Sequence, residues 1–289
     1  MKPNENFLYQ PGNFWAYVRT ISEHVGYSIT KRGPNRGKIK VPSILEMKDA
    51  LEDRLLEVGE IVTKNNEPTS LGVLLHEYYA YRASVLNSFV EPRLMDAARA
   101  KEIFEKLYKE LSSTCPIPMN KQKGDKKTPA YLTGIVNMLI EANADGIPCD
   151  YDPQQLTTIT KDGYPLRTLA RRVDGAFPSV INPIAVWETK EYYYTTTFGS
   201  RVADGVYETL LDGMELRELF ERENIKVYHY MIVDAHYTWW VKGRSYLCRV
   251  IDMLHMGYVD EVLFGYEVVE RMPQIVKEWV ETYKQTDFS

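Results

Sequence analysis

The stretch RRVDGAFPSVINPIAVWETKEYYY, residues 171–194, decides the fold and carries most of the informative polar side chains. Residues 184–187 (Ile-Ala-Val-Trp) are apolar in succession, which is typical of an inner strand in a sheet covered on both faces. Pro178 and Pro183 indicate a turn before this strand. We therefore expect two strands joined by a turn, with the second strand inside the sheet.

The patterns on either side extend this picture. Beyond residue 150, the expected strands cover 156–160, 166–177, 184–197, 226–235 and 259–265, and the expected helices cover 200–222, 244–256 and 272–285. Before residue 150, helices are expected at 43–64, 68–90, 92–112 and 129–143, with a loop at 116–128.

Together these elements predict an α/β protein. We expect a mixed central β-sheet flanked by helices, with a large helical N-terminal part. The change in texture divides the chain into a helical part, 1–150, and a core, 151–289. Ser43 followed by Glu46 indicates a capping box at the start of the helix expected from residue 43.

Composition excludes several classes of protein. Among 289 residues, 44% are hydrophobic and 26% are charged, which excludes a disordered, collagen-like or disulfide-stapled chain. There is no apolar run of about 20 residues and no apolar signal core at the N-terminus, so we expect a soluble, cytoplasmic protein without a membrane partner. Three cysteines without a CxxC pair fit a reducing compartment and do not suggest a zinc site.

The strand after Pro183 carries a pattern with chemical consequences. Side chains alternate between the faces of a strand, so Glu188 and Lys190 point the same way, and a hairpin brings Asp174 beside them. Two carboxylates in one pocket repel each other, and Mg²⁺ relieves that cost by binding them. A neighbouring lysine can position or deprotonate a water and stabilise charge in the transition state. The arrangement suits metal-assisted phosphodiester hydrolysis.

This pattern resembles that of the PD-(D/E)xK nuclease superfamily, in which an acid and an E-x-K triplet lie on adjacent strands. The match is Asp174 followed by Glu188-Thr189-Lys190, with Val173 in place of the proline of the family. It covers roughly residues 165–235, and it implies that the mixed sheet is a restriction-endonuclease-like core. The resemblance implies that all three residues are catalytic and that Asp174 and Glu188 bind the metal. The family often adds a glutamate from a helix, and Glu77 offers one.

Within that superfamily, the chain most resembles a type II restriction endonuclease. The resemblance implies a Mg²⁺-dependent, sequence-specific endonuclease of a restriction–modification system, acting on double-stranded DNA as a homodimer. Residues 1–150 would then supply surfaces for wrapping DNA and for dimerisation. Two alternatives remain: a repair or recombination nuclease of the same fold, and a non-catalytic DNA-binding module. A surface hairpin with a Glu/Lys pair is the purely structural interpretation of the triplet.

Basic residues suggest where DNA would be held. The net charge of −5 argues against a passive nucleic-acid coat protein, but basic side chains still cluster locally. The candidate contacts to the DNA backbone are Lys31, Arg32, Arg36, Lys38 and Lys40 in one loop, and Arg171 and Arg172 beside the expected site. Each group is equally compatible with ordinary solvated side chains.

Overall fold

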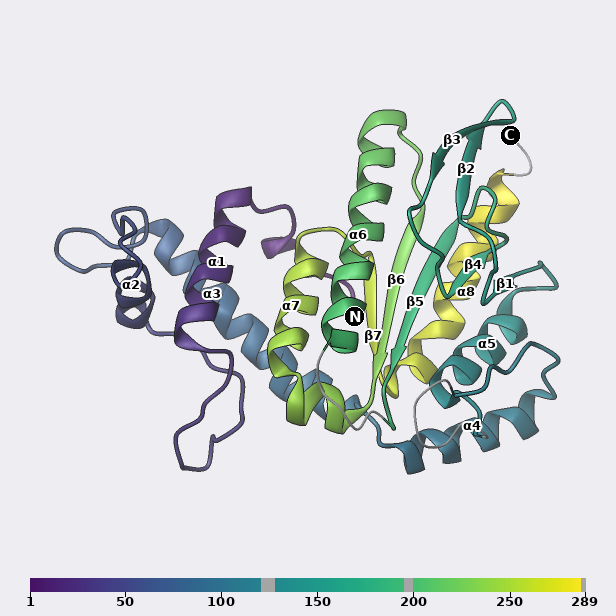
Figure 1. Cartoon of the computed structure of the whole chain (residues 1–289), viewed down its shortest axis with the longest axis horizontal. Coiled ribbons are helices and arrows are strands. Elements are labelled where there is room, and N and C mark those ends of the chain that lie inside the picture. The colour runs from purple at the N-terminus through teal and green to yellow at the C-terminus, as the bar shows by residue number, and fades with distance from the viewer. Residues whose placement is uncertain (121–127, 195–199, 287–289) are drawn as a thin grey trace.

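A computed structural model describes residues 1–120, 128–194 and 200–286 (Figure 1). Its α-helices are α1 (Gly12–Val25), α2 (Ile44–Glu52), α3 (Ser70–Val85), α4 (Ala97–Leu111), α5 (Tyr131–Asn143), α6 (Ser200–Glu223), α7 (Arg244–His255) and α8 (Glu267–Thr286). Its strands are β1 (Asp150–Tyr151), β2 (Thr158–Lys161), β3 (Tyr164–Thr168), β4 (Gly175–Phe177), β5 (Ala185–Glu191), β6 (Tyr228–Asp234) and β7 (Glu261–Phe264). Within the described ranges, no helix is long and apolar enough to span a bilayer.

The strands form one mixed sheet and one separate hairpin. The sheet has the order β1-β4-β5-β6-β7, in which β4 is antiparallel to β1 and β5, while β5, β6 and β7 run parallel. α6 connects β5 to β6, and α7 lies between β6 and β7. β2 and β3 form a separate hairpin that projects beyond the main sheet (Figure 1), and Thr158 of β2 also makes an isolated bridge to Ile181. The predicted mixed central sheet flanked by helices is confirmed.

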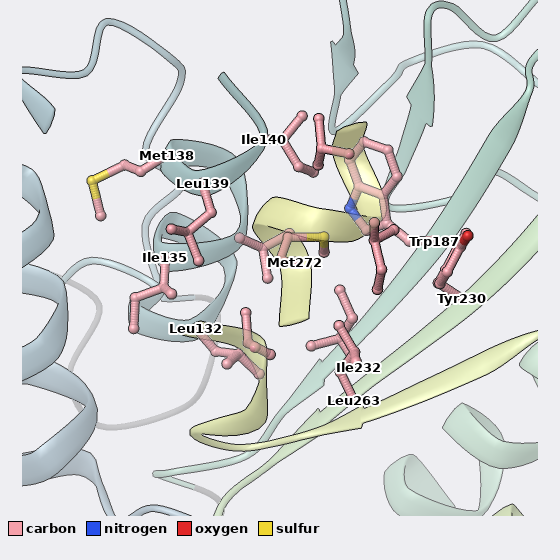
Figure 2. Close-up of a cluster of buried hydrophobic side chains, with 14 of the residues drawn as sticks. Leu132, Ile135, Met138, Leu139, Ile140, Trp187, Tyr230, Ile232, Leu263 and Met272 are labelled. Carbon is pink, nitrogen blue, oxygen red and sulfur yellow. The ribbon is translucent and has the colours of Figure 1, made fainter. Parts of the chain in front are cut away.

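Helices cover both faces of this sheet. α5 and α8 cover one face, where Trp187 of β5 stacks on Trp279 with ring centroids 5.7 Å apart. Figure 2 shows Trp187, Tyr230, Ile232 and Leu263 of the sheet facing the apolar side chains of α5 and α8. α6 and α7 pack on the opposite face. This explains the apolar run at residues 184–187, since β5 is buried on both sides.

The first three helices have a core of their own, separate from the sheet. α1, α2 and α3 pack around Phe14, Trp15, Met47 and Tyr79, and they lie at one end of the molecule (Figure 1). The predicted Ser43/Glu46 capping box is confirmed, because Ser43 Oγ accepts from Glu46 N and the Glu46 carboxylate accepts from Ser43 N. α4 and α5 instead share a core with the sheet and α8, and the division at residue 150 stays a prediction.

The helix expected at 43–64 is wrong beyond its first turns. α2 ends at Glu52, and the chain then turns through Leu55, which adopts a φ of +58° and is 96% exposed. Ile61 and Val62 are nonetheless buried in the same core as Met47. The apolar spacing is therefore real, but an irregular turn, not a longer helix, brings the second group of side chains into the core.

The strand expected at 166–177 is interrupted. β3 ends at Thr168 and β4 begins at Gly175, and residues 169–174 run irregularly between them. Ala170 N donates to the Glu215 carboxylate of α6 over 3.0 Å, and Leu169 is fully buried. This irregular segment places Arg171 over the α6 face of the sheet, which a continuous strand would not do.

Acidification is expected to destabilise the fold through His229 on β6. Burial lowers the pKa of His229 below 6.5, and within the described chain its Nε2 has no hydrogen-bond partner. The folded state therefore binds fewer protons than the unfolded state, so this contribution to stability is present above pH 6.5 and declines as pH falls below it. Relative to His229→Gln, the wild type should lose up to about 1.4 kcal/mol of unfolding free energy per pH unit below 6.5.

Denaturant unfolding of both proteins across pH 5 to 8 checks this prediction. The difference between the two curves isolates His229 from other titrating groups, which are the same in both proteins. Curves that remain parallel throughout would show that His229 is protonated equally in the folded and unfolded states.

Candidate functional site

Asp174 is tied to β5 by two hydrogen bonds at the start of β4. Its backbone N–H donates to Trp187 O over 3.1 Å, and its Oδ2 accepts from Thr189 N over 2.8 Å. The second bond takes the place of a backbone bond in the ladder, so the carboxylate continues the β4–β5 pairing beyond Gly175. The hairpin expected from the sequence thus brings Asp174 level with Glu188 and Lys190.

Gly175 makes this approach feasible. It pairs with Trp187, and a Cβ at residue 175 would lie only 2.0 Å from the Trp187 indole. A larger residue would push β4 away from β5 and carry Asp174 with it. The glycine after the acid therefore has a direct steric role.

Glu188 and Lys190 share one face of β5, as predicted from the alternation, and that face is covered by α6. Lys190 Nζ donates to Glu188 Oε2 over 2.6 Å and to Glu208 Oε2 of α6 over 3.3 Å. Glu188 has no exposed side-chain surface, and Lys190 has 8%. Gly205 of α6 allows the close approach, since a Cβ there would lie 3.2 Å from Lys190 Cδ.

Arg171 joins the same group of side chains from the irregular segment. Its Nη1 lies 2.8 Å from Glu188 Oε1 and 2.5 Å from Asp212 Oδ2, and its Nη2 lies 3.4 Å from Glu208 Oε2. Asp212, on α6, has no exposed side-chain surface, whereas Glu208 is 44% exposed. We call this group the cation–carboxylate cluster; its members are Arg171, Asp174, Glu188, Lys190, Glu208 and Asp212.

The electrostatics of the cluster stabilise the charged form of Lys190 and raise the pKa of two of the acids. Burial and the nearby Glu188 raise the pKa of Asp174 to about 6, and the same two causes raise the pKa of Asp212 to about 7. Burial alone would raise the pKa of Glu188, but Lys190 and Arg171 hold it below the usual value. Burial alone would lower the pKa of Lys190, but Glu188 and Asp174 raise it.

One observation argues against a metal ion in this cluster, and another argues for it. In the described parts of the chain, no group of three or more His, Cys, Asp or Glu side chains is arranged to hold a metal. Glu188, Glu208 and Asp212 instead form ion pairs with Arg171 and Lys190. However, Glu188 Oε1 and Asp212 Oδ1 are buried without an aligned hydrogen-bond donor from the described residues, even though Arg171 is close to Glu188 Oε1. Hard oxygen ligands of this type suit Mg²⁺.

A cavity of about 240 Å³ adjoins Asp174, between the start of α5, strand β5 and the first turn of α6. Asp174, Thr189, Glu191 and Arg201 all contribute to its wall. Glu191 accepts hydrogen bonds from Leu132 N and Thr133 N at the start of α5, and burial raises its pKa to about 8. Asp174 therefore lies at the border between this cavity and the cation–carboxylate cluster.

Glu77 is not brought to the site. It is exposed on α3, and α3 lies with α1 and α2 away from β4 and β5 (Figure 1). The apolar face of α3 is used to pack on the other N-terminal helices, which leaves Glu77 facing solvent. The helical acids next to Glu188 come from α6 instead.

The basic loop is an ordered turn, and only part of it is unpaired. Residues 27–40 fold back on themselves through hydrogen bonds such as Ile29 N to Lys38 O. Lys38 pairs with Glu91 at 3.0 Å and Lys40 with Glu46 at 2.7 Å. The described structure gives no ion pair to three exposed residues of the loop: Lys31, Arg32 and Arg36.

The two arginines beside the site differ from each other. Arg171 is engaged inside the cluster, whereas Arg172 is exposed and donates to Gln154 Oε1 over 2.7 Å. Glu208 and Asp212 were missed from the sequence. The sequence does contain a pattern that indicates them: Glu208 and Asp212 are one helical turn apart, on a helix expected directly after the E-x-K strand.

Comparison with known proteins adds a family but no activity. A family model described as Domain of unknown function (DUF7687) matches residues 95–279, which is more than half of the chain. The chain belongs to the DUF7687 family. A second model, Domain of unknown function (DUF7690), matches residues 1–89. No curated protein and no solved structure matches the chain.

The two family models cover different parts of the fold. The DUF7687 region contains the whole five-stranded sheet and every residue of the cation–carboxylate cluster. The DUF7690 region contains α1, α2, α3 and the basic loop.

Proposed function

We propose that this protein is a Mg²⁺-dependent endonuclease of the type II restriction class, built on a restriction-endonuclease-like core, that cleaves double-stranded DNA at a specific sequence. The observation that carries this proposal is the hydrogen bond from Thr189 N to Asp174 Oδ2. It fixes the acid of one strand beside the Glu-x-Lys pair of the next. The antiparallel β4–β5 pair, followed by the α6 crossover to a parallel β6, gives the order of elements expected for such a nuclease.

Each residue has a distinct part in this proposal. Asp174 and Glu188 would hold Mg²⁺, which when bound activates water and neutralises charge on the phosphate. Lys190 Nζ, held by Glu188, presents a positive charge that stabilises the phosphorane-like transition state. Because α6 covers this face of β5, little solvent reaches Glu188 and Lys190, which strengthens these interactions. Two copies of the chain would cut the two strands, one copy for each strand. Sedimentation of the protein bound to a short duplex tests whether it binds as a homodimer.

The pattern of cleavage products distinguishes a restriction endonuclease from the two alternative functions. Incubation with long defined duplexes in Mg²⁺ should give discrete fragments whose mapped ends share one sequence. A smear, or a preference for ends, nicks or single strands, would favour a repair or recombination nuclease. Binding without cleavage in Mg²⁺ and Mn²⁺ would favour a non-catalytic DNA-binding module.

The unpaired tip of the basic loop is expected to contribute to DNA binding. Replacing Lys31, Arg32 and Arg36 together by Ala should weaken binding to every sequence alike. It should also make the slope of log K against log salt shallower by about 0.9 for each phosphate that the loop no longer neutralises, or about 2.7 for three phosphates. Fluorescence anisotropy at several salt concentrations measures both quantities.

A matched triple variant controls for the change in net charge. Lys101, Lys106 and Lys109 are exposed on α4, and their replacement by Ala removes the same three charges. An equal decrease in affinity in both triple variants would mean that overall charge matters and that the loop does not touch DNA.

A further inference from the structure

A cavity of about 330 Å³ lies where the N-terminal helices meet the helices on the sheet, and no member of the cation–carboxylate cluster lines it. Arg19 comes from α1, Tyr27 from the segment after α1, Tyr207 from α6 and Arg249 from α7. The volume is within the range of small-molecule sites in proteins. The DUF7690 and DUF7687 regions therefore lie on either side of a cavity large enough for a small ligand.

Arg249 reaches this cavity among tyrosines. Its Nη1 donates to Tyr207 Oη over 2.6 Å, and its guanidinium carbon lies 5.8 Å from the centroid of the Tyr27 ring and 5.1 Å from that of Tyr246. These rings attract a cation, but they carry no negative charge that balances it. Among the described residues, no acidic side chain forms an ion pair with Arg249. The guanidinium therefore remains able to pair with an anion.

Arg19 is the second cation at this cavity, and it is exposed on α1. Its Nη2 donates to the thioether sulfur of Met256 over 3.3 Å, and a thioether is only a weak acceptor. In the described parts of the chain, no carboxylate lies within ion-pair distance of this guanidinium. We call Arg19 and Arg249 the cavity arginines.

The carboxylates at the cavity are already paired with other cations. Glu23 contacts Arg54 at 3.0 Å, and Asp252 contacts the buried Arg82 at 3.0 Å. These two are the acidic residues of the described lining. Because their charges are balanced by those partners, the cavity arginines leave a net positive charge that favours an anionic ligand.

The walls of the cavity indicate the rest of the chemistry of the ligand. Tyr27 and Tyr207 supply aromatic rings, and apolar side chains complete the described lining: Val206, Leu210 and Met253. Nucleobases stack on aromatic side chains and on guanidinium planes, and arginine binds phosphate through paired N–H donors. A phosphate monoester carries about 1.5 to 2 negative charges at pH 7, which suits a pair of arginines.

We propose that this cavity binds a nucleoside monophosphate, with the phosphate held by the cavity arginines and the base placed against Tyr27 and Tyr207. The site is separate from the proposed nuclease site, and it does not depend on the proposed function. Because the two regions of the chain supply opposite sides of the cavity, a bound nucleotide stabilises their contact.

The first test measures binding to the full chain by isothermal titration with AMP, GMP, CMP, UMP and inorganic phosphate. We expect at least one nucleotide to bind, and inorganic phosphate to bind at least about tenfold more weakly, because it lacks the stacked base. Arg249→Met and Arg19→Met should each weaken that nucleotide by about tenfold or more. Arg222→Met removes the same charge from an exposed position on α6 and should bind like the wild type. Arg19 is exposed, so its replacement leaves the fold intact.

The second test separates the base from the phosphate. Tyr207 is 50% exposed, so its replacement is compatible with folding. Tyr207→Leu removes the ring and should weaken the nucleotide by about fivefold or more without changing the affinity for inorganic phosphate. Tyr207→Phe keeps the ring and should retain nucleotide binding.

Three results would overturn this inference. Nucleotide affinity that stays the same in both arginine variants would place the ligand elsewhere on the protein. Inorganic phosphate that binds as tightly as every nucleotide would reduce the cavity to a simple anion site. A short single-stranded oligonucleotide that depends on the cavity arginines, in a protein that binds none of the four nucleotides, would assign the cavity to a nucleic-acid strand instead.

Discussion

Asp174→Ala and Lys190→Ala should each slow DNA cleavage by about 10²–10³-fold, while binding to the cleaved sequence stays measurable. Asp174 is fastened to Thr189 N and lies next to Glu188, so its loss removes a carboxylate from the proposed metal site. Lys190 is the buried cation of the site, and removing one preorganised charge of this kind typically costs 10²–10³-fold in rate, or about 2.7–4 kcal/mol. Single-turnover cleavage of a short duplex measures the effect.

Lys161→Ala is the control for this experiment. Lys161 lies on β2, is 64% exposed and pairs with Glu223 at the far end of α6. The Lys161→Ala variant should cleave DNA at the wild-type rate. Thermal unfolding of all variants separates loss of chemistry from loss of fold. If both Asp174→Ala and Lys190→Ala still cleave DNA, these residues are not the catalytic residues.

Asp252→Ala should lower the free energy of unfolding by about 3–5 kcal/mol. Asp252 on α7 accepts two hydrogen bonds from the Arg82 guanidinium, at 3.0 and 3.1 Å, and a third from Tyr78 Oη. Arg82 is only 2% exposed, so removing Asp252 leaves a buried cation with Ser22 as its remaining hydrogen-bond acceptor in the described chain. The pair joins α3 of the DUF7690 region to α7 of the DUF7687 region.

Denaturant titration checks this value against two other variants. Glu23→Ala breaks the exposed pair with Arg54 and should cost less than about 1 kcal/mol. The double variant Arg82→Met/Asp252→Leu removes both buried charges and should recover most of the stability that Asp252→Ala removes. A decrease below about 1 kcal/mol in Asp252→Ala would mean that water reaches Arg82 and that the pair does not join the two regions.

Local patterns predict the strand at the site well. The apolar run at 184–187 indicates an inner strand, and the period of two places Glu188 and Lys190 on one face. Both inferences depend only on strand geometry, and both agree with β5.

Long-range contacts explain what local patterns miss. Arg171 is expected from the sequence at the DNA backbone, but the irregular segment between β3 and β4 directs it into the cluster. Glu77 follows an apolar helical run, yet that run packs against α1 and α2 and not against the sheet. Asp212 belongs to a helix that the sequence predicts, but the face that α6 turns to the sheet is set by tertiary packing. Spacing along a chain does not carry that information.

The most direct test of the central claim is incubation of the wild-type protein with long duplex DNA, with Mg²⁺ in one sample and EDTA in the other, read on a gel. Asp174, Glu188 and Lys190 as a metal-dependent nuclease site predict discrete fragments with Mg²⁺ and intact DNA with EDTA. Intact DNA in both samples, across several sequences and divalent metals, would contradict the account and leave the cluster as a buried ion-pair network that stabilises the fold.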